Sequence, residues 1–99
     1  MKTMEKLIAF YESHKNERTK AVIIGPWKSK KIGNHRVEFF ADGTAKFIYY
    51  STPICIIDEY KNVTITNGGW GTISTTQACN SYSRQLKALG YNVTDTRNK

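Results

Sequence analysis

The residues of this chain that are best suited to chemistry lie in a short basic segment, residues 27–36, which reads Trp-Lys-Ser-Lys-Lys-Ile-Gly-Asn-His-Arg. Lysine and arginine side chains bind phosphates by displacing the counterions around them, and an exposed tryptophan can stack on a base. We interpret the segment as a loop that contacts an anionic macromolecule, above all nucleic acid. The candidate contact residues are Trp27, Lys28, Lys30, Lys31, His35 and Arg36.

The distribution of charge supports this interpretation. The chain has 15 basic and 8 acidic residues and a formal net charge of +7. Between residues 15 and 36, seven basic residues are opposed by Glu17 alone, so this window holds a net charge of +6. Arg84 and Lys87 would extend the basic surface from a helix further along the chain. The alternative is a solvated loop whose lysines keep the protein soluble while Trp27 packs into the core.

The same segment also offers the parts of a small ribonuclease. His35, Arg36 and Glu38 would act as acid, phosphate clamp and base, and residues 36 and 38 would share one face of a strand. However, an imidazole in a loop and a glutamate on an edge strand are explained equally well without catalysis. We therefore expect a protein that is not an enzyme.

Neither the histidines nor the cysteines form a pattern that binds metal. His14 and His35 are the two imidazoles, and neither has metal-ligand spacing to Cys55, Cys79 or a carboxylate. The cysteines lie in apolar surroundings, so we expect buried, reduced thiols in a cytosolic protein. We therefore expect no metal and no other cofactor. We also expect no membrane partner, because no stretch approaches the roughly 18 apolar residues of a membrane span.

A second candidate site surrounds Trp70 in the segment 67–75, which reads Asn-Gly-Gly-Trp-Gly-Thr-Ile-Ser-Thr. Glycines let the backbone turn sharply, and the hydroxyl-rich residues that follow begin a helix whose free N–H groups favour an anion. A small anionic ligand could therefore bind at the turn 68–76. The residues concerned are Gly68, Gly69, Trp70, Thr72, Thr75 and Asn80. The alternative is that Trp70 fills the core and the hydroxyls cap the helix.

This stretch also resembles a family of short, mostly uncharacterised proteins encoded by bacteriophages. The shared pattern is G-G-W-x-T-x-[S/T]-T-x-x-x-x-N, preceded by Y-x-T-P-[hydrophobic] and a strand that ends in Asn-Gly-Gly. The matching residues are Tyr50, Thr52, Pro53, Ile54, Asn67, Gly68, Gly69, Trp70, Thr72, Ser74, Thr75 and Asn80. The chain departs from the family at Gly71 and Ala78, where members often carry arginine. The resemblance implies a phage accessory protein in the cytoplasm of the infected bacterial cell, and it implies no reaction.

Apolar residues at helical spacing predict two helices that position these segments. The first covers residues 4–14 and is capped by Thr3, with a stripe made of Met4, Leu7, Ile8 and Tyr11. The second begins at Ser74, which forms a capping box with Gln77, and it ends before Gly90. Its apolar stripe consists of Cys79, Tyr82, Leu86 and Leu89.

Short β-branched and alternating runs predict the strands. They cover residues 20–24, 36–40, 45–50, 54–57 and 63–66, and residues 91–93 could add a short edge strand. Asp42-Gly43 supplies the positive φ values of a tight primed turn in the clearest hairpin. The polar tail 94–99 is expected to fray.

These elements predict one small domain over residues 1–99 with an α+β fold. An antiparallel sheet of four to five strands would carry the N-terminal and the C-terminal helix on one face. We expect a non-catalytic protein that binds nucleic acid through residues 27–36. The alternatives are an inhibitor that binds a host or anti-phage defence protein, and a binder of a small anionic ligand at residues 68–76. Exposed edge strands would also allow two copies to pair as a homodimer.

Overall fold

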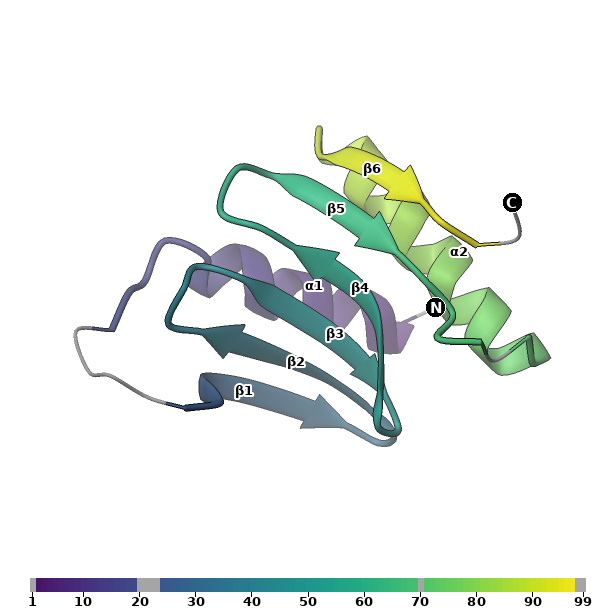
Figure 1. Ribbon diagram of the computed structural model, residues 1–99, viewed down its shortest axis with the longest axis horizontal. Helices are drawn as coiled ribbons and strands as arrows, with labels where there is room; N and C mark the ends of the chain where they lie inside the picture. Colours follow the sequence, from purple (N-terminus) through teal and green to yellow (C-terminus); the bar gives the residue numbers. More distant parts are fainter. Residues whose placement is uncertain (1, 20–23, 70, 98–99) are drawn as a thin grey trace.

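One sheet of six strands carries two helices in this computed structural model, which describes residues 2–19, 24–69 and 71–97. The α+β class is confirmed, and the sheet has one strand more than expected. The elements are α1 (Lys2–His14), β1 (Pro26–Ile32), β2 (His35–Phe40), β3 (Ala45–Tyr49), β4 (Thr52–Ile57), β5 (Asn62–Ile65), α2 (Ile73–Ala88) and β6 (Asn92–Asp95). The strands lie side by side in chain order (Figure 1).

The sheet is antiparallel from β1 to β5, whereas β6 runs parallel to β5. The expectation of a wholly antiparallel sheet is therefore wrong at this edge. The physical reason is the length of the connection: α2 has 16 residues and spans about 24 Å. It returns the chain to the end of the sheet where β5 begins, so the next strand points the same way.

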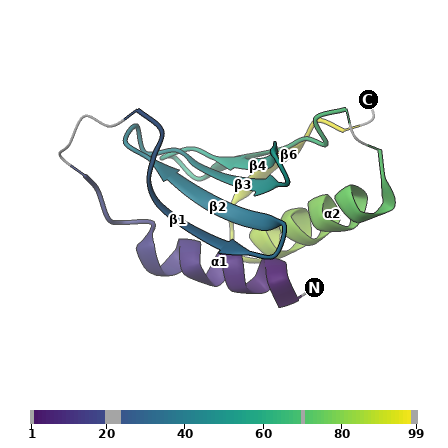
Figure 2. The ribbon, with the colours of Figure 1, turned by 90° about the horizontal axis from the view of Figure 1, so that it is seen from below.

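Both helices lie on the same face of the sheet, as expected, and leave the other face uncovered (Figure 2). α1 packs against β1 and β2, and α2 packs against β4, β5 and β6. The core lies between the two layers, and its largest fully buried side chains include Tyr82, Phe47, Met4, Leu7, Ile54 and Ile57.

The helices confirm the apolar stripes but differ at their ends. All four stripe residues of α1 are buried, and the helix already includes Lys2 and Thr3, so Thr3 is no cap. α2 begins at Ile73 because Thr72, and not Ser74, is extended and accepts the Thr75 N–H (3.3 Å). Leu89 is exposed, since it follows the last helical turn.

The hairpins are closed by different turns from those expected. The basic segment that we predicted as a loop is strand β1, joined to β2 by a two-residue turn at Gly33 and Asn34. Gly33 has a φ of 60°, which suits the first position of a type II′ turn. In the β2–β3 turn only Gly43 has positive φ (91°), and the Asp42 carboxylate accepts the Thr44 N–H (2.9 Å). Because the Phe40 N–H donates to the Thr44 carbonyl (2.9 Å), the turn consists of residues 41–43 and replaces the tight primed turn.

The two ends of the prediction need further correction. Of the strand expected over residues 20–24, residues 20–23 lie outside the described residues, and Ile24 lies in a bend. The tail is ordered further than expected, because β6 continues to Asp95 and Thr96 donates two hydrogen bonds to the Ile65 carbonyl. Residues 98 and 99 lie outside the described residues.

Tyr82 provides a test of the core. Its side chain is 0% exposed and its ring lies 4.7 Å from that of Phe47, yet its hydroxyl has no hydrogen-bond partner among the described residues. Burial also raises the pKa of Tyr82. Because a buried, unpaired hydroxyl costs free energy, Tyr82→Phe is expected to raise the free energy of unfolding by about 1 kcal/mol.

Denaturant unfolding monitored by circular dichroism measures this change. Tyr91→Phe is the matched control, because the Tyr91 hydroxyl donates to Glu12 and its loss should destabilise the protein. A destabilised Tyr82→Phe variant would contradict the assignment of an unpaired hydroxyl.

Candidate functional site

The basic segment forms the edge hairpin β1–β2, which divides its cations between two faces. Residues paired across an antiparallel ladder point to the same side of the sheet. Lys30 pairs with the buried Val37 and therefore points to the helix side, whereas Lys31 pairs with Arg36 on the uncovered face. Consistently, the Lys30 Nζ lies 5.7 Å from the ring centroid of Phe10 on α1. The cations do not form one continuous cluster.

Internal ion pairs occupy two of the four predicted phosphate ligands. Lys28 Nζ lies 3.0 Å from a Glu17 carboxylate oxygen. Arg36 donates to Glu38 (2.8 Å) and to the backbone carbonyl of Tyr50 (2.7 Å). Among the described residues, Lys30 and Lys31 have no carboxylate partner, and both are exposed. These two lysines are the cations of the hairpin that an external anion can reach without breaking an existing pair.

Trp27 is half-buried and is not a free stacking platform. It lies at the irregularity between Pro26 and Lys28, where the register of β1 shifts. Its ring centroid lies 6.3 Å from that of the buried Phe39, and the Lys28 Nζ lies 5.6 Å from the indole. These contacts agree with the alternative interpretation, in which Trp27 packs against the core.

His35 does not join Arg36 and Glu38. The latter two share the uncovered face, as the alternation predicts. His35 pairs with Tyr49 on the opposite face, where the two rings stack at 4.4 Å. The His35 Nδ1 is buried without a partner among the described residues, and burial lowers the pKa of His35. The imidazole and the other two groups of the ribonuclease hypothesis therefore face different sides of the sheet.

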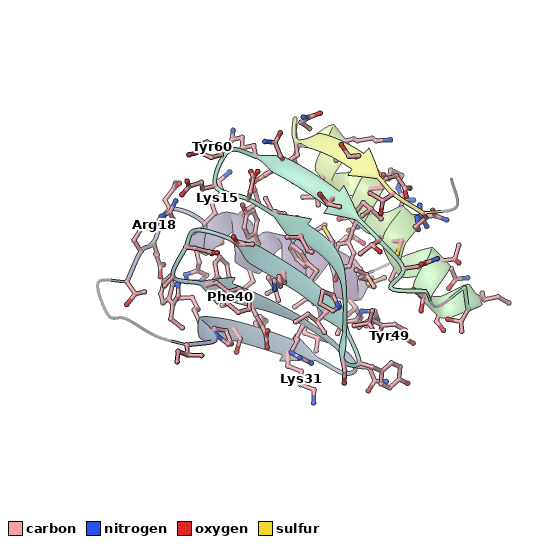
Figure 3. The ribbon with its side chains drawn as sticks, viewed as in Figure 1. Lys15, Arg18, Lys31, Phe40, Tyr49 and Tyr60 are labelled. Atoms are coloured by element: carbon pink, nitrogen blue, oxygen red, sulfur yellow. The ribbon has the colours of Figure 1, made fainter. Side chains whose placement is uncertain are left out.

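Two residues of the uncovered face were missed by the sequence analysis. Lys46 pairs with Glu38 across β2 and β3, and its Nζ lies 4.9 Å from the ring centroid of Phe40. The period-2 alternation of the hairpin was the available signal, because Phe40 and Lys46 share the phase of Glu38. Figure 3 views this face, with Lys31 and Phe40 labelled.

The glycine-rich turn closes on itself before α2 begins. The Gly68 N–H donates to the Thr66 hydroxyl (3.1 Å), and the Gly69 N–H donates to the Asn67 side chain (2.9 Å). Trp70 lies outside the described residues. Asn80 is exposed and accepts a hydrogen bond from Arg97 (2.9 Å).

A cavity of about 450 Å³ lies between the β3–β4 turn and the start of α2. The topology explains its position, because β3 ends, β4 begins and β5 ends at the same end of the sheet. Thr72 and Thr75 therefore meet residues that lie about twenty positions earlier in the chain. The lining residues are Tyr49, Tyr50, Ser51, Thr52, Ile54, Thr72, Ser74 and Thr75. Both halves of the phage-type pattern contribute to this lining.

Arg84 and Lys87 are exposed on α2. Because α2 packs on β4, β5 and β6, these residues belong to the half of the molecule opposite the β1 edge and do not extend the basic surface of the hairpin.

The described residues contain neither an exposed cysteine nor a group of potential metal ligands. Cys55 and Cys79 are free and buried, and burial raises the pKa of both thiols. Within residues 2–19, 24–69 and 71–97, no three histidine, cysteine or acidic side chains are grouped as metal ligands would be. No helix in this part of the chain is long and apolar enough to cross a membrane.

No protein-family model matches the chain, and no curated protein or solved structure matches it significantly. The function of the protein therefore has to be inferred from the geometry and charge of its surface. The resemblance to bacteriophage proteins stays a proposal.

The half-buried imidazole of His35 predicts a dependence of stability on pH. Because folding lowers the pKa of His35, the unfolded chain binds a proton more readily than the folded protein. The contribution of His35 to stability is complete above the unfolded pKa of about 6.5 and is lost as the pH falls below it. His35→Gln should therefore flatten the stability profile between about pH 7 and pH 5.

Urea unfolding across this range measures the effect, and His14→Gln is the matched control. The lowered pKa values of Asp42 and Asp58 act at lower pH and leave this window clear. A slope that persists in His35→Gln and disappears in His14→Gln would contradict the assignment. If His35→Gln does not fold, an NMR titration of the His35 ring in the wild-type protein measures the same pKa.

Proposed function

We propose that this protein is a non-catalytic binding protein for nucleic acid and that the β1–β2 hairpin binds its phosphates. The observation that carries the proposal is the pair Lys30 and Lys31, which are adjacent and exposed and lack a carboxylate partner among the described residues. The hairpin contains four cations and one carboxylate, Glu38, which is already paired with Arg36. An external phosphate therefore meets an excess of positive charge.

The position of the lysines favours an extended ligand. Neighbouring side chains of a strand point to opposite sides, so Lys30 and Lys31 present charge on both sides of the sheet edge. A chain of phosphates that passes along this edge can contact both, whereas a single small anion cannot. The resemblance to bacteriophage proteins supports placing this activity in the cytoplasm of an infected bacterial cell.

Lysines on an edge strand can have a second physical role. Charged side chains at a sheet edge discourage the pairing of exposed strands from two copies of a protein. This role requires positive charge but no ligand, so the experiment has to separate it from binding.

Replacing Lys30 and Lys31 together by glutamine is expected to lower the affinity for an oligonucleotide about tenfold at about 50 mM salt. The slope of log Kd against log salt should fall by about 1.5, because two phosphate contacts are lost. Fluorescence anisotropy with a labelled oligonucleotide measures both quantities.

The matched control is Arg84→Gln with Lys87→Gln, which removes the same charge from α2 and should leave the affinity nearly unchanged. Absence of binding by the wild-type protein at low salt would contradict the proposal. So would a Lys30→Gln, Lys31→Gln variant that self-associates on a sizing column while binding as tightly as the wild type.

A further inference from the structure

The cavity beside the β3–β4 turn has a lining that suits a flat, uncharged group. We propose that it holds one base of a bound single-stranded nucleic acid, an inference that rests on the proposed function. Its volume of about 450 Å³ lies within the range of about 300–1,000 Å³ that small-molecule sites occupy. No lining residue carries a charged side chain, so a phosphate has no cation to meet inside the cavity.

The lining offers both stacking surfaces and hydrogen bonds. Bases stack on tyrosine rings regardless of sequence, and two tyrosines line the cavity. Among the described residues, the hydroxyls of Ser51, Thr52 and Ser74 have no internal partner, and they can bond to the polar edges of a base. Ile54, which is fully buried, provides an apolar wall.

Tyr50 is held in place at the rim of the cavity. It is 60% exposed and its φ is 57°, a conformation that a bulky residue rarely adopts. Its N–H donates to the Asn34 carbonyl (2.8 Å), its hydroxyl accepts from the Asn34 amide (3.0 Å), and its carbonyl accepts from Arg36 (2.7 Å). The ring is therefore positioned before a ligand arrives, which lowers the entropy cost of binding.

Two cations of the hairpin, Lys31 and Arg36, lie next to this rim. Lys31 and Arg36 are directly paired across β1 and β2, and neighbouring strands are about 4.8 Å apart. Arg36 in turn contacts the Tyr50 carbonyl. Figure 3 shows Lys31 and Tyr49 at the same end of the sheet. A phosphate near Lys31 thus lies close enough for a base of the same strand to reach the cavity.

Because the cavity lies next to the positive charges of Lys31 and Arg36, a nucleic-acid base is a better occupant than an aromatic side chain of a partner protein. Both occupants would use the tyrosine rings of the lining, but only a nucleic acid also supplies phosphates for Lys31.

The experiment compares an oligothymidine with an abasic oligonucleotide of the same length. The wild-type protein is expected to bind the base-containing strand about tenfold more tightly, which corresponds to one stacked base. Tyr50→Ala should remove this difference and leave the affinity for the abasic strand unchanged. Tyr60→Ala is the matched control, because Tyr60 is a 75% exposed tyrosine in a turn at the other end of the sheet (Figure 3).

Ser74→Phe provides a second variant that does not disturb the β3–β4 turn, because Ser74 lies on an exposed helical position and its replacement fills the cavity. It should have the same effect as Tyr50→Ala. Thymidine added to the isotopically labelled protein should shift the NMR signals of Thr52 and Thr75 and not those of Lys61.

The outcomes separate the two proposals. Equal affinity of the wild-type protein for both strands overturns the base site and leaves the phosphate-binding function standing. Equal loss of affinity for both strands in Tyr50→Ala and Ser74→Phe also overturns it, because the loss is then independent of the base. No binding of either strand by the wild-type protein overturns the proposed function itself.

Discussion

Two helices on one face of a six-stranded sheet impose a constraint on the strands that they cover. Strands β2 to β5 place buried apolar side chains on the covered face, and their other residues then point to a face without a second layer. Val37, Phe39 and Phe47 satisfy the first condition and are buried. Arg36, Glu38 and Lys46 follow from the second, since they occupy the alternate positions of the same strands. The uncovered face and its charge are consequences of how the core is built.

The same constraint explains how much of the fold could be predicted from the sequence. The stripe of α1 and the alternation in β2 and β5 are visible because burial on one side leaves a period, whereas β4 was recognised as a short apolar run. β1 lacks this signal: its Lys-Ser-Lys-Lys sequence has no apolar alternation, and none of the residues of this edge strand is fully buried. A lysine-rich edge strand therefore has the composition of a loop, and tertiary pairing with β2 decides its structure.

The candidate site was less predictable, because topology and not local sequence assembles it. Tyr50 and Thr72 are 22 positions apart, and they meet since β5 runs antiparallel to β4 and returns the chain to the β3–β4 turn. The direction of β6 depends in the same way on α2. The start of α2 was misassigned for a local reason: Ser74 and Thr72 both precede the apolar stripe, and only the extended backbone of Thr72 identifies the cap.

The net charge of the sequence also does not show which cations are available to an external anion. Lys28 and Arg36 are bound by Glu17 and Glu38, so the free charge of the hairpin is concentrated in Lys30 and Lys31. Arg36 nevertheless has a second structural role, because it also donates a hydrogen bond to the Tyr50 carbonyl at the rim of the cavity. A guanidinium has several donors in a rigid plane, so one side chain can pair with a carboxylate and hold a turn simultaneously. A lysine at this position would keep the charge but could not hold both acceptors in that geometry. The two contacts of Arg36 therefore link the electrostatics of the hairpin to the shape of the cavity.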